Sequence, residues 1–413
     1  MPLPALSVRT TVLISCAVLL AYLGALSLEP PEGGTALQRW LSDDSDRGVY
    51  FDRAQFYAQG RTPYRDVFSE YPTLATLAFA GPYLLPGASG MTPDRYMFRW
   101  SCLMAAVVAV TIAIVATFRR AHGWSAAPAL LLLGPSALYF GLNRFDIVCA
   151  CLVCVSLFAF TRGRALLAYV LLGVATMVKV YPVVVVPVYL AYHLRHDPTR
   201  LRMHVLRYAA AYGLTVLTIV GLTIAWVTWD GFLVPYRFQG GRDAQFFNPY
   251  WVLERSWHHL ALDAAVWHWI GTVFVVLQFS IVPLLWLVRV RSLADVVRFS
   301  VLAIYLFVTF ARIDSPQWIL WYVPAILMIA RGTSTLRLVA MLTVCNYIVF
   351  PVAFDYAFSV EPTTGQRWFS AVVLVKDLVL LALVVALFRE RGVLDEPGGL
   401  EIATREAPVR VRG

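Results

Sequence analysis

Side chains that could carry chemistry gather in a few short groups between long apolar runs of this 413-residue chain. The densest group starts at Asp46-Arg-Gly-Val-Tyr50 and continues through Arg65-Asp66 to Glu70-Tyr71. Four others follow at wide intervals: Asn143-Arg144-Phe-Asp146, Lys179-Val-Tyr181-Pro182, the stretch from Tyr236 through Arg242 to Gln245, and the stretch from Arg312 through Gln317 to Trp318. Carboxylates can accept a proton, and arginine or lysine can neutralise an anion. The spacing predicts one polar site assembled from distant segments.

The composition places these groups in a membrane protein. Hydrophobic residues make up 59% of the chain, charged residues 14%, and the mean hydropathy is +0.67, which lies outside the range of soluble domains. Apolar runs of about 20 residues recur, each long enough to cross a hydrocarbon core about 30 Å thick. We therefore expect an all-α, polytopic fold with about 11–13 crossings. Clear candidates include Thr10–Leu28, Met97–Phe118, Ala126–Phe140, Ile147–Phe160, Leu166–Tyr192, Leu206–Thr228, Ala265–Val288, Val296–Phe310, Trp318–Ala330, Leu336–Phe354 and Phe369–Phe388.

The distribution of basic residues indicates an orientation. The net charge of +9 comes largely from arginines in short inter-helix loops, so it indicates topology and no nucleic-acid partner. If the N-terminus and all the basic loops are cytoplasmic, Pro72–Leu85 has to be re-entrant and Leu166–Tyr192 has to fold as a hairpin. In the alternative topology, some of the basic pairs lie on the outer side of the membrane. The residues leave both versions open. We expect a membrane domain over 1–388 with extracytoplasmic loops at about 29–71 and 231–263. Residues 389–413 are expected to form a disordered cytoplasmic tail.

The N-terminal apolar run and the cysteines each allow a second interpretation. The first apolar run resembles a signal peptide, but no small-residue cleavage pattern follows it, and we interpret it as a retained anchor. All six cysteines lie in apolar segments, where helix packing explains Cys149-x-Cys151-x-x-Cys154 better than a metal site does. No glycine-rich phosphate loop or HExxH motif occurs. We expect no cofactor, although two aspartates near a phosphate leave a divalent ion open.

Each polar group also has a plainer explanation. Arg144 and Asp146 could pair with each other, and Lys179 could extend to the headgroups. Arg237 and Arg242 could be interfacial arginines, while Trp318, Trp321 and Tyr322 are typical of an aromatic belt at the membrane surface. At least two of Asp43, Asp44, Asp46 and Asp52 are expected to be solvated loop charges.

Taken together, the groups favour binding of an anionic lipid-linked substrate. An unpaired charge in hydrocarbon costs several kcal/mol and is tolerated only beside a cavity, a partner or an interface. Cations suit a departing phosphate, and a carboxylate suits deprotonation of an alcohol. These are the parts of a glycosyl transfer site.

The order of the motifs, with Ser315-Pro316-Gln317 last, resembles the polyprenol-phosphate-sugar-dependent glycosyltransferases of the GT-C superfamily. The sequence is most similar to glycosyltransferase family 87, which includes actinobacterial α-(1→2)-mannosyltransferases of phosphatidylinositol mannoside synthesis. The resemblance covers roughly Ser42 to Pro324. It implies that Asp46 is the general base, with Asp52 as the alternative. It also implies contacts to the donor phosphate from Arg144, Lys179 and Arg242, and a sugar pocket shaped by Glu70, Tyr71 and Gln245. We further expect contacts to the sugar or acceptor from Tyr50, Arg65, Asp146, Tyr181 and Gln317.

One departure from the family pattern concerns Gln317, since many members carry a histidine in that segment and an amide cannot transfer a proton. We expect an enzyme that moves a sugar from a polyprenyl phosphate to a hydroxyl of a glycolipid or glycan acceptor, with inversion. The resemblance favours mannose, but arabinofuranose or glucose stays open, as does a lipid-linked sugar transporter or flippase. An assembly subunit would have little reason for such costly charges. We expect a multi-pass plasma-membrane protein, in contact with membrane lipids, whose active site faces the extracytoplasmic side.

Overall fold

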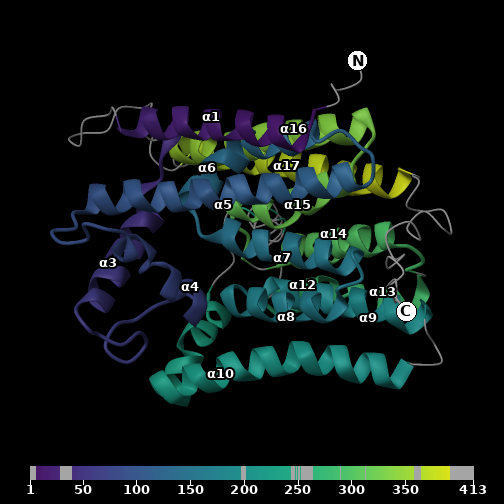
Figure 1. The fold of residues 1–413 in the computed structure, drawn as a ribbon, viewed down its shortest axis with the longest axis horizontal. Coiled ribbons are helices and arrows are strands. Elements are labelled where there is room, and N and C mark those ends of the chain that lie inside the picture. The colour runs from purple at the N-terminus through teal and green to yellow at the C-terminus, as the bar shows by residue number, and fades with distance from the viewer. Residues whose placement is uncertain are drawn as a thin grey trace, which may run out of the picture.

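The computed structural model describes residues 6–27, 40–196, 201–242, 247, 249, 252, 264–288, 290–311, 313–357 and 364–390. Their regular structure is helical, and no β-strand occurs within these ranges. Figure 1 shows most of the long helices running side by side, with α3 and α4 gathered at one end of the bundle. The prediction of an all-α polytopic fold is confirmed.

Five described helical stretches are long and apolar enough to cross a membrane. They are α1 (Val8–Ser27), α5 (Pro93–Ala121), most of α10 (Leu201–Gly240), α16 (Thr333–Tyr347) with η7 (Ile348–Ala353), and most of α17 (Thr364–Arg389). Two bent pairs raise the number to seven: α6 (Pro135–Asn143) with α7 (Asp146–Thr161), and α12 (Ala264–Gln278) with α13 (Ile281–Leu287). Shorter helices are α8 (Ala165–Val178), α9 (Val186–His196), α14 (Leu293–Thr309) and α15 (Ile319–Ile329).

The expected 11–13 crossings were counted from apolar runs, and several of those runs do not form one long helix. The run Ala126–Phe140 is divided into η2 (Ala127–Leu133) and α6 at Gly134-Pro135. Gly134 is extended there because the residue before a proline is disfavoured in the helical region. The run Leu206–Thr228, by contrast, ends where α10 is kinked, with Thr228 at φ 71°.

Two helical hairpins bring the polar turns around Asp146 and Lys179 into contact with each other. The pair α6 and α7 bends by 107°, and the end of α7 returns to the end of α5, where Phe118 contacts Phe158. The run Leu166–Tyr192 also turns back on itself, since Tyr169 of α8 contacts Tyr189 of α9. Ser156 of α7 hydrogen-bonds to both arms of this second hairpin. The hairpin version of the topology is therefore the one formed.

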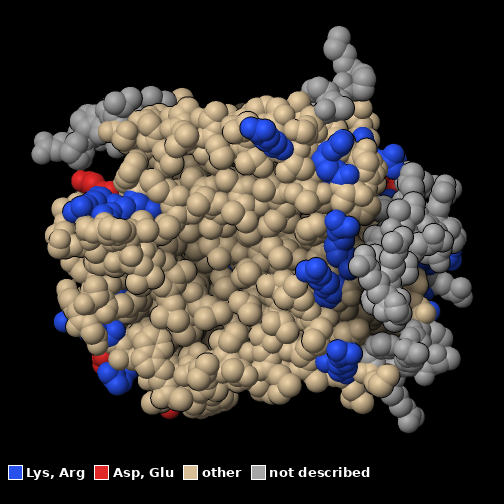
Figure 2. All heavy atoms as spheres, viewed as in Figure 1, with Lys and Arg blue, Asp and Glu red and all other residues tan. Residues whose placement is uncertain are grey.

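The inter-helix basic residues gather at one end of the bundle, which we call the basic end. Arg119 donates hydrogen bonds to the carbonyls of Leu327 and Ala330 at the end of α15. Glu390 accepts from the backbone of Arg331, and its own carbonyl accepts from Arg298. On the face drawn in Figure 2, basic side chains are scattered over the right half, and a second group of charged side chains lies at the left end.

The opposite end, which we call the site end, holds α3 (Asp44–Ala58), α4 (Thr73–Ala78) and η1 (Gly81–Leu84). Pro72–Leu85 does not cross the bundle but forms the short helices α4 and η1. Arg99 of α5 holds η1 against the start of α5 by donating to the Pro82 and Pro86 carbonyls. The predicted loop 231–263 begins later than expected, because residues 231–240 belong to α10; most of its remainder, and the tail beyond residue 390, lie outside the described residues.

Candidate active site

A cavity of about 760 Å³ opens at the site end. Its polar wall comes from α3, the α6–α7 turn, the break after α8, the end of α10 and the segment before α15. Its apolar wall includes Val275 of α12, Phe307 of α14 and Phe350 of η7. Segments more than 200 residues apart in the chain therefore share one hollow.

Helix α3 presents Asp46 to the cavity because Asp43 caps its N-terminus. The Asp43 carboxylate accepts hydrogen bonds from the Ser45 backbone N–H at 3.1 Å and from the Ser45 hydroxyl at 2.6 Å. Side-chain caps of this kind typically contribute about 1 kcal/mol. The cap fixes the first turn, in which Asp46 lies, and places Tyr50 one turn further on the same face.

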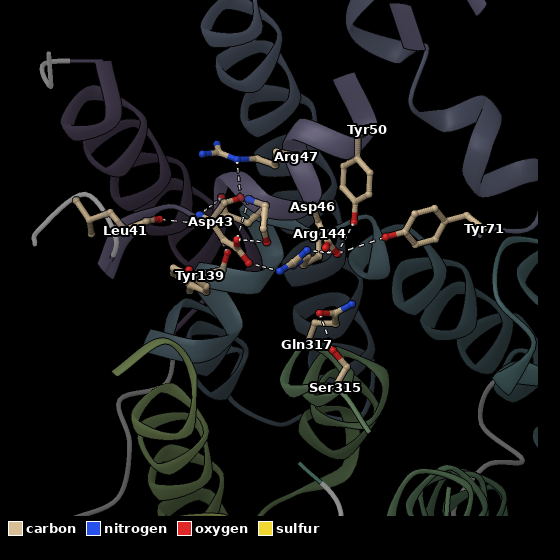
Figure 3. Close-up of polar contacts among 12 residues, drawn as sticks. Leu41, Asp43, Asp46, Arg47, Tyr50, Tyr71, Tyr139, Arg144, Ser315 and Gln317 are labelled. Atoms are coloured by element: carbon tan, nitrogen blue, oxygen red, sulfur yellow. Dashed lines mark hydrogen bonds and ion pairs between the residues drawn. The ribbon is translucent and has the colours of Figure 1, made fainter. Parts of the chain in front are cut away.

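Arg144 forms ion pairs with both Asp43 and Asp46. It lies in extended backbone between α6 and α7, and it is buried. Figure 3 shows the guanidinium between the two carboxylates. Asp43 is buried together with Arg144 and is its second counter-ion. The charge of Arg144 would therefore stay compensated if Asp46 took up a proton.

The contacts of Asp46 converge on one carboxylate oxygen. Oδ2 pairs with Arg144 and accepts long hydrogen bonds, both 3.4 Å, from the hydroxyls of Tyr50 and Tyr71. The described residues donate no hydrogen bond to Oδ1. This oxygen is available to an acceptor hydroxyl in the cavity, while Oδ2 holds the carboxylate in place.

Lys179 lies at the turn between α8 and η3 (Tyr181–Val185), on the cavity wall. Its ammonium pairs with Asp146 at 2.6 Å and lies 4.7 Å from the ring centre of Phe145 and 5.0 Å from that of Trp321. The Trp321 indole N–H donates to the same oxygen of Asp146 at 2.7 Å. These contacts fix a cation at the cavity surface, and the fully buried Asp146 lies behind it.

Arg242 follows the end of α10 and also lines the cavity. It donates to the side chain of Gln239 at 3.1 Å, and Gln239 in turn donates to the Glu70 carbonyl at 3.2 Å. Desolvation lowers the pKa of Arg242, against the effects of Tyr71 and Glu70, but an arginine keeps its charge at neutral pH. No carboxylate of the described residues pairs with it.

Gln317 faces the Asp46–Arg144 pair from the opposite wall (Figure 3). The Ser315 hydroxyl donates to the Gln317 side-chain oxygen at 2.9 Å. The amide nitrogen of Gln317 is thus left to donate into the cavity. Asn346 of α16 holds the same segment by donating to the Pro316 carbonyl at 2.8 Å.

The predicted site residues fall into four groups by position. Those that line the cavity are Asp46, Glu70, Tyr71, Arg144, Lys179, Tyr181, Arg242 and Gln317. Tyr50 and Asp146 contact these residues from behind. Asp52 is exposed on another face of α3, and Arg65 pairs with Asp66 in an exposed turn, so neither lines the cavity. Gln245 lies outside the described residues.

Several plainer interpretations of the sequence are wrong. Arg144 and Asp146 pair with other partners and not with each other, and Lys179 is held by Asp146 instead of reaching the headgroups. Trp321 and Tyr322 are buried, so they do not form a surface belt. The sequence reasoning also overlooked Lys376-Asp377, two adjacent charges inside the apolar run Phe369–Phe388 that could have marked a buried cluster.

No group of three or more His, Cys, Asp or Glu side chains within the described ranges is arranged to hold a metal ion. The polar wall supplies carboxylates, cations and tyrosine hydroxyls instead. Metal independence stays a prediction.

A multi-pass helical bundle with this cavity at one end fits an enzyme that acts at a membrane surface. The family model of glycosyltransferase family 87 matches residues 68–316, which is more than half of the chain. The chain belongs to this family and is a membrane glycosyltransferase, with a sugar donor and an acceptor as its substrates. The search of curated proteins finds no match. Because the family match begins after α3, it leaves the role of Asp46 untested.

Proposed function

We propose that this enzyme transfers a sugar, with mannose favoured, from a polyprenyl phosphate to a hydroxyl of a glycolipid or glycan acceptor. The observation that carries the proposal is the composition of one cavity. It combines Asp46, whose Oδ1 accepts no hydrogen bond from the described residues, with the cations Lys179 and Arg242 and an apolar wall.

The proposed reaction is a single displacement at the anomeric carbon. The acceptor oxygen attacks that carbon and its proton passes to Asp46 Oδ1. The bond between the anomeric carbon and the phosphate oxygen breaks, and its electron pair leaves with the phosphate. Arg242 and Lys179 neutralise the growing charge on the phosphate. A β-linked donor then gives an α-linked product.

The apolar wall suits the lipid part of the donor. Val275 of α12 lines the cavity and is 44% exposed, so this wall continues onto the outer surface of the bundle. Phe238, at the end of α10, also lines the cavity and is 39% exposed. A polyprenyl chain lying between α10 and α12 would bring its phosphate to Arg242.

The proposed orientation follows from the basic end. The helix ends and short inter-helix loops at the basic end carry arginines such as Arg119 and Arg331, which favours the placement of this end in the cytoplasm, so the site end faces the extracytoplasmic side of the plasma membrane.

The test is a transfer assay with the purified protein in vesicles. Polyprenyl phosphates carrying mannose, glucose or arabinofuranose are supplied with glycolipid or glycan acceptors, and the products are examined for a new glycosidic bond. Formation of an α-linked product supports the proposal, and the donor panel identifies the sugar. Movement of the labelled lipid across the vesicle membrane without a new bond would favour a transporter and refute the proposal.

A further inference from the structure

A second ionic cluster is buried behind the cavity. Lys376, in the middle of α17, contacts Asp314 Oδ2 at 3.1 Å and Asp377 Oδ1 at 3.1 Å. Its ammonium also donates to the backbone carbonyl of Phe247 at 3.2 Å. The side chains of Lys376 and Asp314 are each 5% exposed. Charges buried this deeply are costly, so the pairing has to be maintained for the helix to pack.

The cluster is connected to the cavity by a short chain of hydrogen bonds. Asp314 Oδ1 accepts from the backbone N–H of Ser315 at 2.7 Å, and the Ser315 hydroxyl donates to Gln317 at 2.9 Å. Lys376 is therefore linked, through Asp314, to the wall that faces Asp46. Its second tie ends at Phe247, which lines the same cavity. One ammonium thus holds two separate segments of the cavity wall.

We propose that Lys376 is a positioning residue for sugar transfer, which holds Asp314 and Phe247 so that the Gln317 amide is aimed at the sugar opposite Asp46. Lys376 itself does not line the cavity. This inference rests on the proposed function for its catalytic readout, but the ties themselves can be measured without substrate.

The experiment compares four variants in the full-length protein. Lys376→Met removes both ties but leaves Asp314 without its cation, so it risks misfolding. Lys376→Met with Asp314→Asn removes the ties and the buried carboxylate of Asp314 together, and leaves only Asp377, whose side chain is 17% exposed, without its cation. Lys376→Arg keeps the cation and its donors. Asp377→Asn is the matched control, because it removes the third contact of Lys376 on the same helix but leaves the ties to Asp314 and Phe247 in place.

Two quantities are measured on folded, monodisperse protein: hydrogen exchange of the amides in 313–318, and kcat and KM for the polyprenyl-phosphate sugar. In the double variant we expect faster exchange and a kcat about tenfold lower, the loss expected for one misplaced hydrogen bond. The KM for the donor should change less than about threefold, since Arg242 and the apolar wall are untouched. Lys376→Arg and Asp377→Asn should resemble the wild type in both readouts.

Unchanged exchange in the double variant, or a kcat within about twofold of the wild type, would overturn the inference. A fall in activity explained wholly by loss of folded protein would do the same. If the wild type transfers no sugar from any polyprenyl phosphate, the proposed function fails. The exchange measurement then still decides whether Lys376 holds the segment 313–318.

Discussion

The substitution Asp46→Asn separates proton acceptance from the other contacts of this carboxylate. Asparagine keeps an oxygen that can accept from Tyr50 and Tyr71, but it cannot take up the proton of the acceptor hydroxyl. The ion pair with Arg144 is lost, yet Arg144 retains its pair with Asp43. The variant should therefore fold, because no buried charge is orphaned.

The expected loss in rate follows from this geometry. A positioned general base contributes about 10²- to 10⁴-fold, and the remaining hydrogen bonds still orient the side chain. We expect kcat to fall about 1000-fold, which corresponds to about 4 kcal/mol of transition-state stabilisation. The KM for the donor should change little, since the proposed phosphate contacts lie on other segments.

The assay measures sugar transfer per folded enzyme, with Asp52→Asn as the control. Asp52 is on the same helix but is exposed and does not line the cavity, so its amide variant should retain activity within about twofold. If Asp46→Asn kept full transfer activity while Asp52→Asn abolished it, the assignment of the base would be refuted.

Three further predictions concern the cations and the buried cluster. Arg242→Gln should raise the KM for the polyprenyl-phosphate donor by about tenfold, because it removes a charge-assisted contact to the phosphate. The control is Arg65→Gln, at an exposed arginine, which should leave this KM unchanged. Equal effects of the two variants in steady-state kinetics would contradict the assignment of Arg242 to the phosphate. Lys179→Met should destabilise the protein by about 3 kcal/mol, because it leaves Asp146 buried without a cation, and adding Asp146→Asn should recover much of the loss in thermal unfolding. Burial raises the pKa of Asp314 from 3.8 to about 6, so the protonated carboxyl is favoured in the folded state and this group's contribution to stability falls as the pH rises across that window. Asp314→Asn should flatten the melting temperature between those pH values, and an unchanged slope would assign the dependence to other groups.

The gathering of Asp46, Arg144 and Lys179 around one cavity could be anticipated from the sequence. Each charge lies beside an apolar run, and the cost of leaving it in hydrocarbon favours a shared hollow. The resemblance to glycosyltransferase family 87 is confirmed by the match over residues 68–316.

The pairing of the charges could not be predicted in the same way. Arg144 is two residues from Asp146 but pairs with carboxylates about a hundred residues away, because the α6–α7 turn directs the two side chains to different neighbours. Trp321 was assigned to the membrane surface because its residue type is common there, whereas the packing of α15 places it against Lys179. Only the three-dimensional arrangement distinguishes such cases.

The two hairpins have a consequence for how the chain is inserted during synthesis. Each leaves from the basic end and comes back to it, since the end of α7 lies beside the end of α5 and α9 packs beside α8, so the chain after each hairpin continues from the end at which it entered. A change in the length or charge of either tip therefore alters the reaction centre without inverting any helix that follows. Selection can vary the chemistry at the tips independently of the orientation of the rest of the bundle.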